Sequence, residues 1–303
     1  MSRTMQHPRV TVAMPLYRSA PFLDIIRANL DRLREPGLEV LISDRHGLDD
    51  AIDILECDYG HDPRVSFLRA TDAIGWVGHF NELMGVARGD YFVWMQHDDT
   101  FPEGYVEALV AAAEATPGCR IAFGGIETQS LESRVTSAAV PLGRFCHAGQ
   151  WSRRSAHRLL FSGWIGVPFR GAIHRARVLA AVGPMRDTPR SSGAEQIWIY
   201  ALALGGPLVF TPATACVKRV HAGSFTGQLR VTPSVLWAGR RALAACIAPL
   251  PWTRQLEARA LFGLFTLARI GYHAVLRVAL PATMAGAIRD RLYRCVNLDA
   301  PAP

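Results

Sequence analysis

The stretch that decides the fold is Asp90–Asp99, DYFVWMQHDD, in which a strongly apolar run ends abruptly in polar and acidic residues. A short run rich in aromatic and β-branched side chains is typical of a buried strand. In an open α/β sheet, residues placed directly after a strand lie at its carboxyl end, where such folds bind ligands. The adjacent carboxylates Asp98 and Asp99 are costly to hold together unless a cation or a donor-rich ligand neutralises them. The stretch therefore predicts a metal or ligand site at the edge of a sheet.

The residues after this stretch predict a helix that runs to about Ala115. Thr100 and Glu103 have the spacing of a capping box, and Pro102 suits the first helical turn. A simpler interpretation of the acidic pair is that one Asp merely caps this helix. Because Thr100 already supplies the expected cap, we favour the metal or ligand role.

Outward from this stretch, strand and helix signals alternate over the first 130 residues. Short apolar runs predict strands at Val10–Met14, Glu39–Ser43, Val65–Arg69, Asp90–Met95 and Ile121–Ile126. Helical spacing of apolar residues predicts helices between them, at Asp24–Leu33, Asp49–Cys57 and Val77–Ala87. Repeated β-α units imply an α/β fold with a mostly parallel sheet and helices on both faces.

The second half of the chain is less regular. Residues 127–192 are less regular and are rich in Gly, Ser and Arg. A helix is expected at Glu195–Leu204 and a strand at Leu208–Val217. From about Pro233 the pattern is helical only, so we expect an all-helical extension at the C-terminus.

The composition describes a globular chain with an uneven charge distribution. Half of the 303 residues are hydrophobic, and the formal net charge is +7. Residues 1–229 contain 23 basic and 23 acidic residues, whereas residues 230–303 contain ten Arg and three acidic residues. A neutral body with a basic end is not typical of a nucleic-acid-binding core, so we expect no nucleic-acid partner.

Other sequence signals favour a cytoplasmic protein. The six cysteines are scattered without a CxxC pair, which indicates neither a disulfide framework nor a zinc ribbon. Residues 1–9 are polar and lack the apolar segment of a secretory signal. The longest apolar stretch, residues 261–280, is interrupted by two Arg and a His, so a membrane span is not expected.

Four motifs follow one another in the first half of the chain. They are VTVAMPLY at Val10–Tyr17, DAIGWVGHFN at Asp72–Asn81, ARGDYF at Ala87–Phe92 and WMQHDD at Trp94–Asp99. Their consecutive order resembles that of family 2 glycosyltransferases, which have the GT-A fold, and the resemblance extends over about residues 9–225. It implies a metal-dependent, inverting glycosyltransferase of the hexosyltransferase type. The implied donor is a nucleoside-diphosphate sugar, with UDP favoured, and the implied cofactor is Mn²⁺ or Mg²⁺.

The resemblance also implies which residues bind the donor. Pro15 and Tyr17 would form a turn into the donor pocket, and Asp44 falls where the family keeps a carboxylate for the nucleotide base. From the local residues alone, Asp44 suits a contact to a base or ribose and an Asx-turn equally well. The complete donor-binding set implied is Pro15, Tyr17, Asp44, Asp72, Gly75, Asn81, His97, Asp98, Lys218 and Arg219.

Two departures from the family pattern affect this set. His97 stands at the first position of the family's DxD motif, so metal binding would rest mainly on Asp99, with Asp98 nearer the ribose or diphosphate. Asp72 replaces the usual Asn and places a negative charge near a negatively charged donor. Either the donor contact is altered or Asp72 is a solvated loop residue.

The second half of the chain supplies the implied catalytic group. The segment GAEQIW at Gly193–Trp198 resembles the acidic helix start that carries the family's catalytic base, with Glu195 as the matching carboxylate. The dipole at a helix N-terminus would keep this carboxylate ionised. The segment KRVHAGS at Lys218–Ser224 resembles the end of the catalytic domain, where His221 would be a metal or diphosphate ligand or a structural residue.

The acceptor would be a hydroxyl on a glycan, a lipid-linked oligosaccharide or a small natural product. Trp164 and Arg170 lie in the segment that forms the floor of the family's acceptor pocket, although core packing explains such residues equally well. Residues 186–193 are expected to form a loop beside Glu195 that orders over bound donor.

We expect a catalytic domain at residues 1–229, with a donor half at about 1–126 and an acceptor half at about 127–229. Residues 230–303 would be a basic helical module. Two interpretations of this module remain open. It either lies on a membrane, at the inner face, through Arg and apolar residues, or it packs on the catalytic domain or on a second subunit as a homodimer.

The sequence bears on three other functions. A nucleotidyltransferase usually has a Gly-rich signature after the first strand, and Pro15–Arg18 contains no glycine. No GxGxxG follows a strand, which disfavours a dinucleotide-dependent dehydrogenase. A catalytically degenerate GT-A-fold binding or scaffold protein is the alternative that the unusual residues His97, Asp72 and Glu195 keep open.

Overall fold

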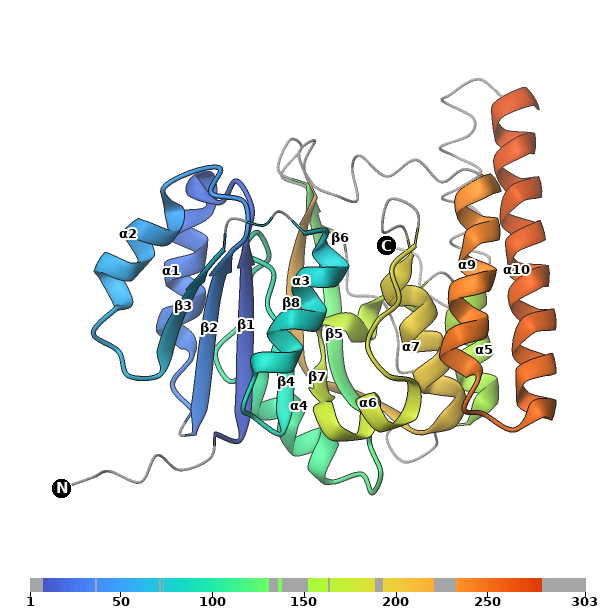
Figure 1. The fold of residues 1–303 in the computed structure, drawn as a ribbon, viewed down its shortest axis with the longest axis horizontal. Helices are drawn as coiled ribbons and strands as arrows, with labels where there is room; N and C mark the ends of the chain where they lie inside the picture. The colour runs from blue at the N-terminus through green and yellow to red at the C-terminus, as the bar shows by residue number, and fades with distance from the viewer. Residues whose placement is uncertain are drawn as a thin grey trace.

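A computed structural model of the protein describes residues 8–279 apart from 36, 71, 73, 131–135, 138–151, 163, 189–192 and 221–232. Its strands form one sheet in the order β3-β2-β1-β4-β7-β5-β6, with β8 paired to β5 (Figure 1). The strands are β1 (Val10–Leu16), β2 (Leu38–Asp44), β3 (Val65–Arg69), β4 (Tyr91–Trp94), β5 (Ile121–Ser130), β6 (Thr136–Ser137), β7 (Ala172–His174) and β8 (Leu208–Val220).

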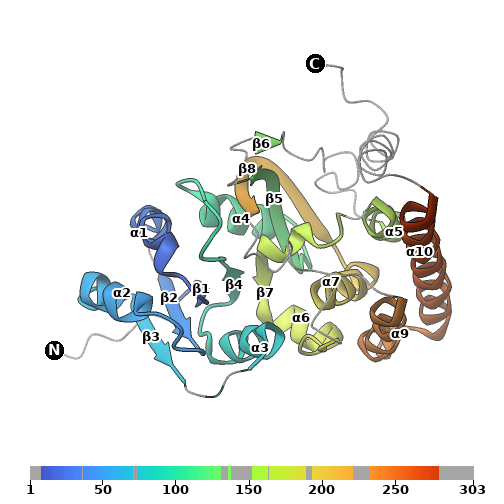
Figure 2. The same cartoon turned by 90° about the horizontal axis from the view of Figure 1, so that it is seen from above.

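Helices flank this sheet, and the predicted α/β fold with a helical C-terminal extension is confirmed (Figures 1 and 2). The helices are α1 (Leu23–Arg32), α2 (Ala51–Tyr59), α3 (Trp76–Val86), α4 (Tyr105–Glu114), α5 (Arg153–Ser162), α6 (Arg175–Val182), α7 (Ala194–Gly205), α9 (Pro233–Ile247) and α10 (Trp252–Ala279). Two short 3₁₀ turns, η1 (Ala20–Phe22) and η3 (Val167–Arg170), precede α1 and β7.

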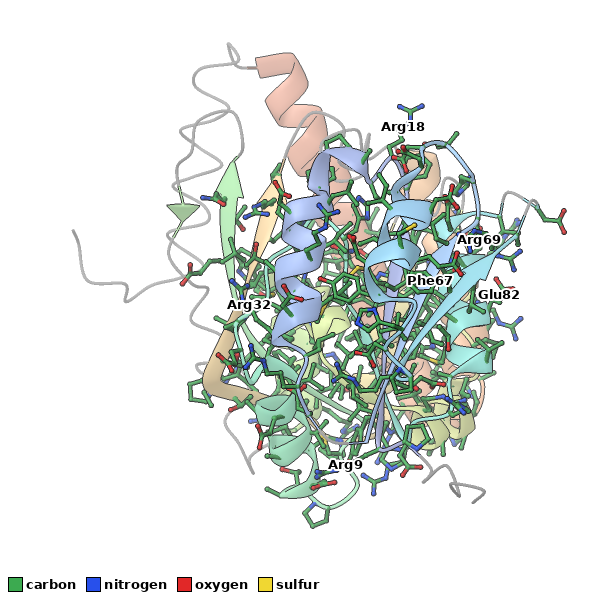
Figure 3. The ribbon with its side chains drawn as sticks, turned by 90° about the vertical axis from the view of Figure 1, so that its left-hand side faces the viewer. Arg9, Arg18, Arg32, Phe67, Arg69 and Glu82 are labelled. Atoms are coloured by element: carbon green, nitrogen blue, oxygen red, sulfur yellow. The ribbon has the colours of Figure 1, made fainter. Side chains whose placement is uncertain are left out.

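The strand directions place one end of most strands at a common edge of the sheet. β1 is parallel to both β2 and β4. β7 is antiparallel to β4 and to β5, so β5 and its parallel neighbour β8 run in the same direction as β4. Figure 3 shows Arg9, which precedes β1, and Arg18, which follows it, at opposite ends of the molecule. The carboxyl ends of β1, β2, β4 and β8 therefore lie at the edge marked by Arg18.

Residues 127–192, which were expected only to be less regular, contain α5, η3, β7 and α6; β7 has only three residues, too few for a periodic signal. One expectation about local structure was wrong. The capping box at Thr100 and Glu103 does not form, because α4 begins at Tyr105 after Gly104, whose φ is +71° and whose position has no side-chain cap. Thr100 instead pairs with Val217 of β8 through two backbone hydrogen bonds of 2.9 Å.

An aromatic cluster packs β4 of the sheet against α3, η3 and α7. Phe80 of α3 is fully buried, and its ring centroid lies 5.2 Å from Trp94 and 5.5 Å from Phe92 of β4. It also lies 5.0 Å from Phe169 of η3 and 5.7 Å from Trp198 of α7. Rings at these separations and tilts pack favourably. Residues Gln96–Asp99, which follow β4, are called the acidic stretch. Phe80 thus links the elements that carry the acidic stretch and the predicted catalytic base.

The C-terminal helices share the hydrophobic core of the sheet. α9 packs against α7, and α10 packs against α9 and α5. Leu243, Cys246 and Phe262 of these helices are buried within the same core cluster as the strands. Among the described residues, no helix combines the length and the apolar character needed to cross a membrane. The boundary between residues 1–229 and 230–303 stays a prediction.

Candidate active site

The acidic stretch after β4 is anchored by a buried ion pair. Asp99 is 1% exposed, and its Oδ2 accepts a 2.7 Å hydrogen bond from Nε of Arg170. Its Oδ1 accepts a 3.0 Å hydrogen bond from the backbone N–H of Arg219, at the end of β8. Both carboxylate oxygens of Asp99 are therefore engaged with groups of the protein itself.

Arg170 comes from η3, directly before β7, and is almost completely buried. Its guanidinium also donates a short hydrogen bond to Oε1 of Gln96, at the start of the acidic stretch. Burial by itself would lower the pKa of Arg170, but the Asp99 carboxylate beside it outweighs burial and raises that pKa. Arg170 therefore remains a cation and ties both ends of the stretch to β7. Its predicted acceptor contact stays a prediction.

A residue that sequence reasoning missed completes this anchor. Asn29 of α1 is 1% exposed; its Nδ2 donates to the backbone oxygen of Asp99 at 2.9 Å, and its Oδ1 accepts from the backbone N–H of Phe101 at 3.1 Å. The available signal was its place among Ile26 and Leu30 on the apolar face of the predicted helix. A buried polar side chain in such a position requires hydrogen-bond partners.

Glu195 occupies the first turn of α7, directly after Gly193 and Ala194. Its Oε2 is buried and has no hydrogen-bond partner among the described residues. Burial raises the pKa of Glu195, and its own backbone N–H, Lys218 and Arg170 oppose this shift. The cost of desolvating the carboxylate exceeds these favourable interactions, so the pKa of Glu195 is raised despite its place at a helix N-terminus. Its ionised state stays a prediction.

Lys218 brings the two acidic parts of the site together. Burial lowers the pKa of its ammonium group, and Arg170 acts in the same direction. The carboxylates of Asp99, Glu195 and Asp98 oppose this lowering. Lys218 therefore lies within electrostatic reach of the acidic stretch on one side and of the predicted base on the other. Asp98 is half-buried, unlike Asp99.

The ends of β1 and β2 form the neighbouring part of the edge. Nδ1 of His97 lies 3.1 Å from the backbone oxygen of Pro15, which fastens the acidic stretch to β1. Tyr17 is 48% exposed, and its ring meets that of His46 edge-on at 5.1 Å. These contacts place Pro15, Tyr17 and His97 at the predicted donor edge, where their donor contacts stay predictions.

Asp44 ends β2 and is buried. Its Oδ1 accepts hydrogen bonds of 2.8 Å and 3.0 Å from the backbone N–H groups of His46 and Gly47. The Asx-turn, one of the two interpretations of this residue, is therefore present. A contact from Asp44 to a base or ribose stays a prediction.

The remaining predicted donor residues lie on and before α3. The Asn81 amide makes two hydrogen bonds to the backbone of Met185, donating at 2.8 Å and accepting at 2.9 Å. Because both of its groups are engaged, Asn81 fastens α3 to the segment after α6. Asp72 is exposed, and Gly75 precedes α3. Donor contacts from these residues stay predictions.

The remaining predicted features are Trp164, Arg219, His221 and the loop at residues 186–193. Trp164 is half-buried and packs against the hydrophobic core, so its acceptor contact stays a prediction. Arg219 directs Nε toward Oε1 of Gln129 at 3.4 Å. His221 lies outside the described residues, as does part of the predicted loop at residues 186–193.

The described residues contain no group of three or more His, Cys, Asp or Glu side chains that is suited to hold a metal ion. A cation bound here would have to obtain most of its ligands from elsewhere. Mg²⁺ commonly does so, since it is held by one or two carboxylates together with substrate phosphates. Both oxygens of Asp99, the carboxylate predicted to hold the metal, are already engaged with groups of the protein, and its metal contact stays a prediction.

Two solved structures similar to this one contain a nucleotide sugar. TarS residues 1–349 of S. aureus, in complex with UDP-GlcNAc, superposes with a TM-score of 0.66 and 13% identity over 90% of this chain and 76% of that chain. The mannosyltransferase PcManGT of Pyrobaculum calidifontis, in complex with GDP-Man and Mn²⁺, superposes with a TM-score of 0.53 and 17% identity over 96% of this chain and 82% of that chain. At these identities the likeness shows the GT-A fold alone.

Sequence comparison gives the family. No curated protein matches the chain by sequence. The profile described as glycosyl transferase family 2 matches residues 11–171, which is more than half of the chain and includes β1, the acidic stretch and Arg170. With the sheet order and the site at its carboxyl edge, this match shows that the chain belongs to glycosyl transferase family 2.

Proposed function

We propose that the protein transfers a sugar from a nucleoside-diphosphate donor to an acceptor hydroxyl, with inversion, and that Glu195 is the general base. The observation that carries this proposal is the Glu195 carboxylate, whose Oε2 is buried without a hydrogen-bond partner among the described residues. A buried oxygen without a partner is costly, and an acceptor hydroxyl would provide the missing donor. The raised pKa of Glu195 also makes it a stronger base than an exposed carboxylate.

In the proposed reaction Glu195 takes the proton of the acceptor hydroxyl while the hydroxyl oxygen forms a bond to the anomeric carbon. The bond between that carbon and the diphosphate oxygen breaks, and the nucleoside diphosphate leaves with the electron pair. Lys218 lies within electrostatic reach of Glu195 and of the acidic stretch, so it is placed to stabilise the charge that develops on the leaving group.

We propose that a divalent cation, Mn²⁺ or Mg²⁺, joins this site together with the donor and is held by Asp98. When bound, the cation would neutralise charge on the leaving diphosphate. A metal on Asp99 would have to displace Arg170 or the backbone N–H of Arg219, and Asp98 is the less buried of the two carboxylates. Replacing Asp98 with Asn should therefore raise the Mn²⁺ concentration that half-activates the enzyme.

UDP is the proposed donor nucleotide, and the acceptor is proposed only as a hydroxyl compound. The similar structure of TarS was solved with UDP-GlcNAc and that of PcManGT with GDP-Man. A thermal-shift panel of UDP- and GDP-sugars, each with and without Mn²⁺, would identify the donor, since a bound ligand raises the unfolding temperature.

The second candidate function is a GT-A-fold protein that binds a nucleotide sugar without transferring it. The ion pair between Asp99 and Arg170 favours this alternative, because it occupies the carboxylate predicted to hold the metal. Release of free sugar from the donor separates the two functions, since a binding protein would be stabilised by the donor and would release none.

The test of the proposed base compares two Glu residues that both lie in the first turn of a helix. Glu195→Gln should abolish transfer and donor hydrolysis while the donor still raises the unfolding temperature. Glu107→Gln is the matched control, because Glu107 lies in the first turn of α4 and is exposed. Equal turnover by the Glu195→Gln variant and the wild type would exclude Glu195 as the base.

A further inference from the structure

The outward face of α10 is apolar and lacks a packing partner among the described residues. Trp252 is 70% exposed, Leu256 55%, Leu264 57% and Leu267 59%. At about 100° per residue, these positions and Ala260 fall within roughly a third of the helix circumference. Exposed large apolar side chains gathered on one face indicate an interaction surface rather than chance.

The inward face of the same helix packs against the rest of the protein. Phe262 is buried and stacks on Tyr200 of α7 at 6.3 Å. Glu257 pairs with Arg153 at 2.8 Å and lies 3.1 Å from Nε2 of His157, both on α5. The packing on the catalytic domain therefore consumes one face of α10 and leaves the apolar face outward. Figure 2 shows α9 and α10 side by side at the end of the molecule opposite α1 and α2.

Next to this face lies a basic pocket between α9 and α10. It has a volume of about 220 Å³ and is lined by Arg240, Arg241, Leu243, Ala244, Arg259 and Phe262. Among the described residues, no carboxylate forms an ion pair with any of the three arginines. Arg259 follows Leu256 by three positions on α10, so the pocket borders the apolar face directly.

An exposed Trp that contacts Arg240 of the pocket is of the type found where protein meets lipid. The Arg240 guanidinium lies 4.4 Å from the ring centroid of Trp237, which is itself 55% exposed. Trp is enriched at membrane interfaces because its ring is apolar and its N–H is polar. The sequence of α9 and α10 contains six Arg and one acidic residue, Glu257, and that residue is turned toward α5.

We propose that α9 and α10 dock the protein on the surface of an anionic lipid bilayer. The exposed Trp and Leu side chains of α10 would enter the region of the headgroups and upper acyl chains, and the three-arginine pocket would bind a lipid phosphate. Apolar insertion combined with Arg at anionic headgroups is the usual basis of peripheral membrane binding. Arg binds phosphate well because its planar fork donates two parallel hydrogen bonds.

Charge complementarity favours the bilayer over a second copy of this chain. An isologous contact through this face would place two sets of unpaired arginines near each other, and like charges brought together destabilise an interface. An anionic bilayer neutralises the same arginines. This inference does not depend on the proposed transfer reaction.

The test is flotation of the purified full-length protein with vesicles of phosphatidylcholine alone or with about 30% phosphatidylglycerol. We expect the wild type to float only with the anionic vesicles and to be released at about 0.5 M salt. Arg240→Gln/Arg241→Gln/Arg259→Gln should weaken partitioning roughly a hundredfold, since each interfacial Arg contributes about fivefold. Trp252→Ser/Leu256→Ser/Leu267→Ser should also abolish flotation.

The control variant is Arg34→Gln/Val86→Ser, which removes an exposed Arg and an apolar side chain that is 53% exposed from outside α9 and α10. It should float like the wild type, and thermal unfolding would show that every variant is folded. Three results would overturn the proposal: no flotation of the wild type, equal flotation with neutral vesicles, or a wild-type dimer in sedimentation analysis that the Trp252→Ser/Leu256→Ser/Leu267→Ser variant converts to monomer.

Discussion

Removal of one partner of the Asp99–Arg170 ion pair should destabilise the protein far more than loss of an exposed ion pair. The two side chains are 1% and 10% exposed and their N···O distance is 2.7 Å. Removing one member of a buried pair leaves an unpaired charge in the interior and typically costs about 3–5 kcal/mol. Asp99→Asn and Arg170→Met should therefore each lower the free energy of unfolding by about that amount.

The double variant Asp99→Asn/Arg170→Met should lose much less than the sum of the two single losses. With both charges absent, no buried charge is left unpaired, so the double variant avoids the cost that each single variant incurs. Independent effects would add to about 6–10 kcal/mol, which is comparable with the whole stability of many proteins. A coupling energy of several kcal/mol is the expected result.

Urea unfolding at neutral pH, followed by tryptophan fluorescence, measures these losses. Arg153→Gln is the control, because Arg153 and Glu257 are 52% and 34% exposed and such pairs contribute about 0–1 kcal/mol. The reasoning is refuted if the single variants lose less than about 1 kcal/mol, or if their losses simply add in the double variant.

The expected loss of stability affects the interpretation of activity measurements on Asp99 variants. An inactive Asp99→Ala variant would be explained by a destabilised acidic stretch as well as by a lost metal ligand. Asp98→Asn lacks this ambiguity, because Asp98 is half-buried and Asp99 would keep Arg170 paired. Mn²⁺ titration of the Asp98→Asn variant is therefore the sharper experiment on the metal.

Three further predictions concern pH and packing. Activity should fall as pH decreases through the pKa of Glu195, which burial raises above the usual Glu range, and a pH–rate profile that is flat down to pH 4 would contradict this. Burial lowers the pKa of His79 from 6.5 to about 4, so about 3 kcal/mol of stability, fully present above pH 6.5, should be lost between pH 7 and pH 4. His79→Gln should flatten that part of the stability–pH curve, as measured by urea unfolding at each pH. Gly89→Ala should cost about 1–3 kcal/mol, because its Cβ would lie 2.5 Å from the backbone nitrogen of Thr11. Gly85→Ala, with open space at its Cβ, should be neutral or slightly stabilising. Thermal unfolding of the two glycine variants measures both effects.

Elements with a strong local signal were predictable from the sequence. The strand at Val65–Arg69 has the same bounds in the structure, and α1, α3 and α7 begin within one residue of their predicted starts. β7 was not predictable, because three residues do not show a period and this strand exists only where β4 and β5 pair with it. The capping box at Thr100 failed for a similar reason, since pairing with Val217 commits the backbone of Thr100 elsewhere.

The candidate site, too, was predictable only in part. Its members were found from residue types at strand ends and from the order of motifs, which are properties of short stretches. Their partners were not found, because Asp99 meets Arg170 and Arg219 across separations of 71 and 120 residues. Asn29 was overlooked although it stood on an apolar helix face, because its partners lie 70 and 72 residues away.

Short stretches of this chain are enough to specify the strands and helices of its first 130 residues, its family, and the acidic and basic residues proposed for its site. Hydrophobic period and turn chemistry act over a few residues, so they are visible without a fold. Tertiary structure alone decided that Asp99 is an anchored partner of Arg170, that Asp98 is the less buried carboxylate, and that burial raises the pKa of Glu195. Desolvation and charge pairing depend on which distant groups surround a side chain, and only the packed sheet brings those groups together.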